Sequence, residues 1–138
     1  MSDIPDAIFR FVEHELYNYQ STKEDLRDMK EDIAESSLGN LDYDDFSSNK
    51  GYPGSTTEAT VTDIITNKAI IRATKTIRDI EEAKNKLNED KLKLFHLKYN
   101  NRMPWQQITM EIGISERTYF RWREEIVRET AKEMGLIT

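Results

Sequence analysis

The fold is decided by residues 103–135, which read MPWQQITMEIGISERTYFRWREEIVRETAKEMG. Pro104 suits the first turn of a helix, where its missing N–H needs no partner. Gly113 can adopt the positive φ of a helix end, and Ser115 can cap the helix that follows. We therefore predict two short helices joined by a three-residue turn, with Ile114 as a buried plug between them.

Apolar residues recur along one face of each of these two helices. In both, they are spaced i, i+3 and i+7, which aligns them in a single stripe. We expect the two stripes to pack against each other and against the helix upstream. The stripes are Trp105, Ile108 and Ile112 in the first helix and Tyr119, Trp122 and Ile126 in the second.

The opposite face of the second helix is rich in arginine. It carries Arg117, Arg121, Glu124 and Arg128, with Phe120 at its edge. An arginine fork can bond O6 and N7 of guanine in the major groove, or it can hold a phosphate. This face therefore predicts a helix-turn-helix that binds double-stranded DNA. Phe120 is either a contact to a thymine methyl group or a partly exposed core residue.

Residues of the turn and of the first helix complete the expected DNA contacts. The start of the first helix would lie near the DNA backbone, and the start of the second would reach a phosphate or a base edge. The alternative is an amphipathic helix pair whose arginines only face solvent. The coincidence of turn, stripes and arginines favours DNA binding. The additional contacts are Trp105, Gln106, Gln107, Ser115, Glu116 and Thr118.

Two amphipathic segments are expected upstream. The first runs from about Pro5 to Ser36, and the second has a heptad-like seam broken only at Lys84. Each seam needs a partner, which is either the other segment folded back antiparallel or the same helix of a second subunit. The seam residues are Ile8, Val12, Leu16, Tyr19, Leu26, Met29 and Ile33 in the first, and Ile70, Ala73, Ile77, Ile80 and Leu87 in the second.

Between these segments, residues 37–57 read SLGNLDYDDFSSNKGYPGSTT and predict a loop. The cluster of aspartates at 42, 44 and 45 lacks the glycine and terminal glutamate of a calcium-binding loop, so we expect no metal there. Ser55 and Glu58 fit a capping box at the start of the next helix. A further helix is expected after Asn88, ending at about residues 100–102.

The charge of the chain is unevenly distributed. The net charge is −6, but residues 1–60 hold 14 acids and 5 bases, whereas residues 61–138 hold 12 acids and 15 bases. This asymmetry suggests a basic part that faces DNA and an acidic part that faces something else, although an acidic solvated surface would look the same.

Catalysis and cofactor binding are not expected. The chain has no cysteine, which excludes disulfides, thiolate catalysis and cysteine-ligated zinc. His14 and His96 have no second histidine at helical spacing, and no nucleophile elbow or phosphate-binding glycine loop occurs. Glu124 and Glu125 are adjacent and point to different faces of a helix. The N-terminus lacks the basic residues of a signal peptide, and no apolar run could span a membrane, so we expect a cytoplasmic protein.

We therefore predict an all-α fold in which an N-terminal helix and a long middle helix form a hairpin or coiled coil, followed by a C-terminal helix-turn-helix. The expected parts are residues 1–60, an acidic helix and loop, residues 61–88, the middle helix, and residues 89–138, the DNA-binding part. A homodimer through the N-terminal and middle helices would raise the affinity for DNA, because the glutamates leave the second helix only weakly basic.

The stretch LKLFHLKYNNRMPWQQITMEIGISERTYFRWREEIVRETAKEMGLI resembles the C-terminal part of the RinA and ArpU-type phage transcriptional regulators, whose helices are similar to region 4 of sigma-70 factors. ISERTYFRWREEI is its specific portion, and HELYNYQSTKEDLRDMKEDI resembles their N-terminal helix. The resemblance implies a phage or prophage activator of late genes that contacts the RNA polymerase of its bacterial host.

Two other functions compete with this one. A small terminase subunit, which recognises DNA during phage packaging, also joins a helix-turn-helix to an oligomerisation region, but usually with the DNA-binding part first. It should form a large ring, whereas a regulator should be a monomer or dimer. A module that binds polymerase and not DNA is the third function, and salt-dependent binding to promoter DNA would exclude it.

Overall fold

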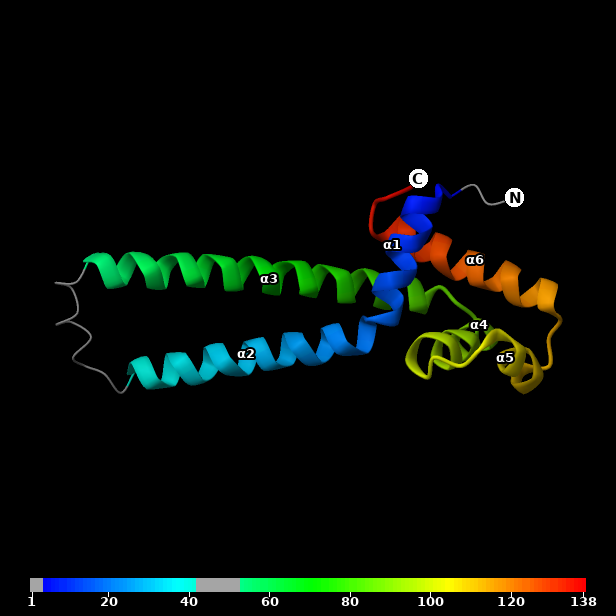
Figure 1. Cartoon of the computed structure of the whole chain (residues 1–138), viewed down its shortest axis with the longest axis horizontal. Coiled ribbons are helices and arrows are strands. Elements are labelled where there is room, and N and C mark those ends of the chain that lie inside the picture. The colour runs from blue at the N-terminus through cyan, green and yellow to red at the C-terminus, as the bar shows by residue number, and fades with distance from the viewer. Residues whose placement is uncertain (1–3, 42–52) are drawn as a thin grey trace. The chain divides into compact units, whose positions relative to one another are not determined.

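The chain is all α-helical, as expected, over the residues that the structure describes. In the computed structural model these are residues 4–41 and 53–138, with side chains described for residues 4–33 and 67–138. This part of the chain forms six α-helices, one short π-helix and no strand (Figure 1). The elements are α1 (Asp6–Tyr17), α2 (Tyr19–Leu41), α3 (Pro53–Asn85), α4 (Glu89–Phe95), the π-helix η2 (His96–Asn100), α5 (Trp105–Ile112) and α6 (Glu116–Glu133).

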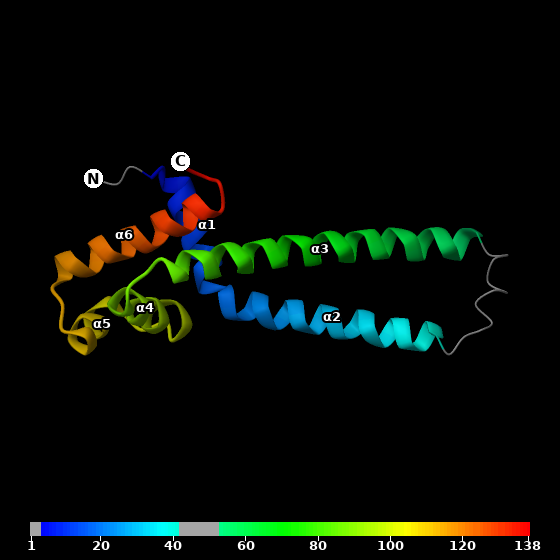
Figure 2. The same ribbon diagram turned by 180° about the vertical axis from the view of Figure 1, so that it is seen from behind.

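Two compact units make up the chain. One joins residues 1–22 to residues 76–138, and the other consists of residues 23–75. The first unit contains α1, α4, η2, α5 and α6, together with the start of α2 and the end of α3. The second contains the rest of α2 and α3, which run beside each other in opposite directions (Figure 1, Figure 2). The first 22 residues therefore share one compact unit with the C-terminal segment.

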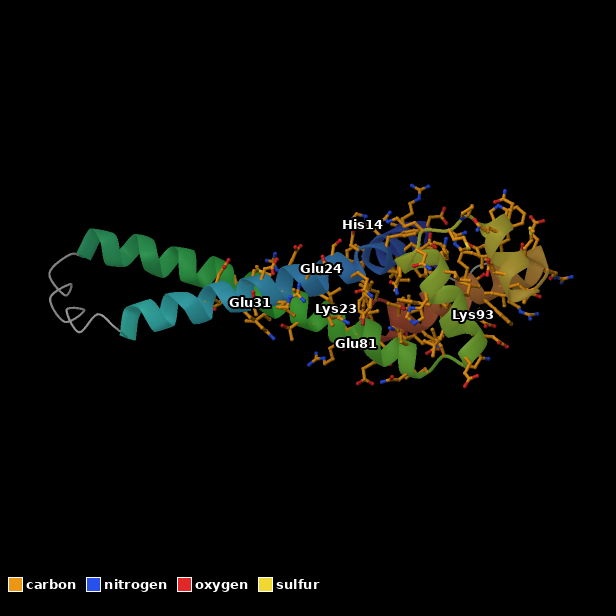
Figure 3. All side chains as sticks on the ribbon, turned by 90° about the horizontal axis from the view of Figure 1, so that it is seen from below. His14, Lys23, Glu24, Glu31, Glu81 and Lys93 are labelled. Carbon is orange, nitrogen blue, oxygen red and sulfur yellow. The ribbon has the colours of Figure 1, made fainter. Side chains whose placement is uncertain are left out.

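Within the second unit, side chains are described only for residues 23–33 and 67–75, and many of the exposed ones are charged. Lys23, Glu24 and Glu31 are exposed on α2 (Figure 3). Ile33 on α2 and Ile71 on α3 are also exposed, by 37% and 66%. Among the described residues, no helix has the length and apolar character needed to cross a bilayer.

The first amphipathic segment is two helices, not the single helix expected from about Pro5 to Ser36. α1 ends at Tyr17, and Asn18 leaves the helical conformation with φ −92° and ψ 2°. Asparagine disfavours helix interiors because its side chain competes for local hydrogen bonds. Here the Asn18 amide donates to Nε2 of His14 at 2.9 Å. The expected apolar face persists across the break, because Val12, Leu16 and Tyr19 are all buried.

The long helix α3 begins earlier and ends earlier than expected. It starts at Pro53, so Ser55 lies inside its first turn and is not its N-cap. Proline is favoured at the first helical position. α2 continues to Leu41, so helix replaces both ends of the loop expected over residues 37–57. The aspartates at 42, 44 and 45 lie outside the described residues.

The seam of α3 is buried in its C-terminal part. Ile77 and Ile80 are buried, Ile70 and Ala73 are half-buried, and Leu87 lies beyond the end of the helix. Lys84, the one residue that interrupts the apolar seam, packs its ammonium group against aromatic rings. The Nζ atom of Lys84 lies over the rings of Tyr19 and Phe95, 5.1 and 5.2 Å from their centroids. Such cation–π contacts let a lysine occupy an otherwise apolar position.

The helix expected after Asn88 is present and continues into a π-helix that the sequence pattern did not indicate. The Asn88 side chain accepts a hydrogen bond from the backbone N–H of Lys91 at 2.9 Å and caps α4. Phe95 and Tyr99, which are four residues apart and so face the same way, are buried. η2 ends at Asn100, where the sequence predicts a break. Within η2, Lys98 is also buried next to Tyr99.

A polar cluster joins α1 to η2 and α6 inside the first unit. The Glu13 carboxylate accepts two hydrogen bonds from the Arg123 guanidinium, at 2.8 and 2.7 Å, and one from the Tyr99 hydroxyl at 2.9 Å. The Lys98 ammonium lies 3.7 Å from the same carboxylate and donates to the Tyr17 hydroxyl at 2.8 Å. We refer to Glu13, Tyr17, Lys98, Tyr99 and Arg123 as the Glu13 cluster.

Within the Glu13 cluster, the ionised side chains are stabilised by one another and not by solvation. Burial by itself would raise the pKa of Glu13, but the hydrogen bonds from Arg123 and the charges of Lys98 and Arg123 outweigh it, so the pKa is lowered. Burial would lower the pKa of Lys98, but the hydrogen bond to Tyr17 and the charge of Glu13 raise it. Each group is therefore held in its charged form by its neighbours.

We expect Glu13→Gln to reduce the free energy of unfolding by about 3 kcal/mol, because it leaves two cations without their buried anion. The loss of stability caused by this substitution should be smaller at acidic pH. The lowered pKa means that the ionised Glu13 stabilises the fold above its unfolded pKa, and that this contribution is lost as the pH falls through the folded value. Urea unfolding at neutral pH and below pH 4.5 measures both effects.

The matched control is Glu15→Gln, which removes the same charge from α1 at a half-buried position outside the cluster. It should change the stability by less than about 0.5 kcal/mol. Equal effects of the two substitutions at neutral pH would show that the Glu13 cluster does not stabilise the fold.

Candidate nucleic-acid interface

The turn between α5 and α6 has the local geometry that its residues predict. Gly113 adopts φ 79° and ψ 42°, the left-handed conformation of a helix C-terminus. The backbone N–H groups of Gly113 and Ile114 both donate to the Thr109 carbonyl, at 2.8 and 3.1 Å. The Ser115 hydroxyl oxygen accepts from the backbone N–H of Thr118 at 3.1 Å and caps α6. The predictions for Gly113 and Ser115 are confirmed.

The two predicted stripes are buried only in part. Ile108, Tyr119 and Ile126 are fully buried, whereas the other three members are half-buried. Ile114 is also half-buried, so the prediction that it is a buried plug is wrong. It lies in a tight turn, where the two helix ends cannot enclose it. The half-buried stripe residues are Trp105, Ile112 and Trp122.

The C-terminal half of α6 buries a further set of residues that sequence analysis missed. Val127, Thr130 and Ala131 are buried, and α1 packs against α6. The Thr130 hydroxyl donates to the Ile126 carbonyl at 2.9 Å, which satisfies it within the helix. The spacing of Val127 and Ala131 was visible in the sequence. The packing of α1 on α6 was not, because the two helices are remote in the chain.

The four arginines of α6 fall into two groups. Arg123 is bound by Glu13, and Arg128 is paired with Glu124 at 2.9 Å. Arg117 and Arg121 are exposed, and within the described part of the chain neither has a hydrogen-bond or salt-bridge partner. Two guanidinium groups thus project from the first half of α6 toward solvent, on the opposite side from Tyr119 and Ile126.

The remaining expected DNA contacts lie in the first turn of α5 and at the start of α6. Gln106 and Gln107 are exposed in the first turn of α5, and Glu116 is exposed at the start of α6. Ser115 and Thr118 are engaged with each other, because the Ser115 hydroxyl also donates to Oγ1 of Thr118 at 3.0 Å. Their side chains therefore order the start of α6.

Phe120 lies between the core and the exposed face. Its side chain is 38% exposed. Its ring packs edge-on against Tyr119, with centroids 4.9 Å apart, and lies 5.7 Å from the ring of Trp105. The Arg123 guanidinium carbon lies 6.0 Å from the centroid of the Phe120 ring and 4.8 Å from the centroid of the Phe9 ring. The ring is thus held by neighbours while one part of it stays open to solvent.

No group of three or more metal-ligating side chains occurs among the described residues. His96 is exposed, and its Nδ1 lies 2.7 Å from the Asn100 amide nitrogen. Burial and the charge of Lys84 lower its pKa. His14 makes the same kind of contact with Asn18, so each histidine bonds the asparagine four residues later.

A comparison with protein families assigns this chain to a family. The sequence model of the family described as "Protein of unknown function (DUF722)" matches residues 12–132. The chain belongs to the DUF722 family. The match extends from α1 to α6, so both Glu13 and Arg123 lie within the DUF722 region. No curated protein and no solved structure is significantly similar to the chain.

We expect Gly113→Ala to destabilise the protein by about 1–2 kcal/mol, the cost of a left-handed conformation for a residue with a Cβ. A Cβ at this position meets no atom within 4 Å, so the cost comes from φ alone. Gly113→Asn is the control, because asparagine adopts this conformation more readily. Urea unfolding compares the two. An alanine variant as stable as the asparagine variant would contradict the left-handed geometry of the turn.

Proposed function

We propose that this DUF722 chain is a phage or prophage transcriptional regulator that activates late genes. In this proposal, α5 and α6 form a helix-turn-helix, and the first half of α6 enters the major groove of promoter DNA. The observation that carries the proposal is the pair of exposed arginines, Arg117 and Arg121, which have no partner within the described residues.

The packing of α6 supports this role. A helix that reads base edges must be held rigidly from the side that faces away from DNA. Tyr119, Ile126 and Val127 are buried on that side, and Arg123 is tied to Glu13. The arginines at 117 and 121 project from a helix whose rotation is fixed by these contacts.

The charge of α6 limits the affinity of a single chain. Of its arginines, Arg128 is paired with Glu124, and Glu116 adds a negative charge beside Arg117. A site with so few uncompensated cations releases few counterions from DNA and binds weakly. We therefore propose a homodimer through the N-terminal and middle helices, which would place two such sites on one duplex. Contact with the host RNA polymerase belongs to the same proposal, because it follows from the resemblance to sigma-like regulators.

The double substitution Arg117→Ala, Arg121→Ala should weaken binding to promoter DNA by about 1–3 kcal/mol for each bidentate base contact that is lost. If the arginines bind phosphates instead, the slope of log affinity against log salt should become shallower by about 0.9 for each contact. Fluorescence anisotropy with a labelled duplex at several salt concentrations measures both. Helicity should be unchanged, because both side chains are exposed.

The matched control is Arg72→Ala, Arg78→Ala, which removes two exposed arginines from α3. It changes the net charge equally and should leave most of the affinity intact. If the two double variants bind DNA as tightly as the parent, α6 is not the recognition helix.

Sedimentation equilibrium should show a homodimer. Exposed apolar residues of α2 and α3 support this expectation, because Ile33 and Ile71 would lose contact with water in such an interface. Ile33→Asp, Ile71→Asp should therefore shift the protein to a monomer without unfolding it. Met110→Asp, at an 81% exposed apolar position on α5, is the control and should leave the dimer intact. A parent that forms a large ring would favour a packaging protein over a regulator.

A further inference from the structure

An aromatic ring is held open to solvent beside the exposed arginines of α6. Phe120 is three residues after Arg117 and directly before Arg121. At about 100° per residue, its direction differs by about 60° from that of Arg117 and by about 100° from that of Arg121. The exposed part of the ring therefore borders the surface that carries both guanidinium groups.

The ring is fixed in position rather than loosely exposed. Trp105 and Tyr119 contact it from α5 and α6, and the Arg123 guanidinium lies on a further side. Arg123 is itself fixed by two hydrogen bonds to Glu13. A ring with such neighbours loses little conformational freedom when a ligand covers its open edge, so more of the contact energy is available for binding.

The chemistry of the exposed part of the ring selects one feature of duplex DNA. A phenyl ring neither donates nor accepts a conventional hydrogen bond, so it gains nothing from the polar groups of the base edges. The only apolar group that the bases display in the major groove is the C5-methyl of thymine. The arginines beside it match O6 and N7 of guanine. This surface thus combines a side chain suited to thymine, Phe120, with two suited to guanine, Arg117 and Arg121.

We propose that Phe120 is a specificity-determining residue that contacts the C5-methyl group of a thymine next to a guanine contacted by Arg117 or Arg121. The inference rests on the proposed function, since it needs α6 in the major groove. The sequence offered two roles for Phe120, a thymine contact or a partly exposed core residue. In this proposal the ring has both roles, because one part of it packs on the core and the exposed part contacts DNA. The operator of this protein therefore contains thymine adjacent to guanine in each half-site.

The experiment begins with selection of bound duplexes from a random pool, using the full-length protein. Each thymine of the selected site is then replaced singly by uracil, which removes only the methyl group. One uracil should lower the affinity of the parent about fourfold, the factor that corresponds to burial of one methyl group. The same uracil should leave the affinity of Phe120→Ala unchanged, whereas Phe120→Leu, which keeps an apolar edge, should retain part of the discrimination.

The controls separate this inference from the function on which it rests. Leu136→Ala removes an apolar side chain that is exposed to the same extent as Phe120, 38%, beyond the end of α6, and should leave the uracil effect at its parental size. Thermal melts of both Phe120 variants establish that they fold. Binding that is indifferent to every uracil, or an equal uracil effect in Phe120→Ala, overturns the role of Phe120 while DNA binding stands. Failure of the parent to select any duplex overturns the proposed function itself.

Discussion

The Glu13 carboxylate accepts hydrogen bonds from a guanidinium and a phenol that come from the far end of the chain, and an ammonium group lies beside it. One anion thus faces two cations, Arg123 and Lys98, in a site that is largely shielded from solvent. Ionised groups that are taken out of water stabilise a fold only when their partners are close and correctly oriented. The bidentate geometry of Arg123 and the short bond from Tyr99 supply that orientation, and they fix α1 against α6 and η2.

This arrangement gives α6 two sides with different roles. Its inner side is occupied by the contacts with α1 and α5, which leave no freedom for the helix to rotate. Its outer side keeps Arg117 and Arg121 solvated, and Phe120 lies at the boundary. An arginine in this helix can therefore stabilise the fold or remain available to a ligand, according to its position around the helix axis. Arg123 is of the first kind, and its place four residues after Tyr119 puts it on the inner side of the helix.

Local features of the fold were predictable from sequence, whereas contacts between distant segments were not. The turn at Gly113, the cap at Ser115, the helix after Asn88 and its end at Asn100 each depend on residues within a few positions of one another. The predicted helix ends were less accurate. The helix α3 begins before Ser55, because a proline can start a helix as well as a serine can cap one. The pairing of Arg123 depends on α1, which lies more than a hundred residues earlier and leaves no periodic signal. The DNA contacts themselves stay predictions, because they depend on a ligand.

The division of one compact unit between residues 1–22 and residues 76–138 has a consequence for synthesis on the ribosome. The apolar face of α1 emerges well before α6, the helix that packs against it, has been translated. At about 5–20 residues per second, α1 must wait for several seconds with that face uncovered. This unit therefore cannot complete its folding before α6 has been synthesised, and nascent α1 is a segment for a chaperone to shield until then.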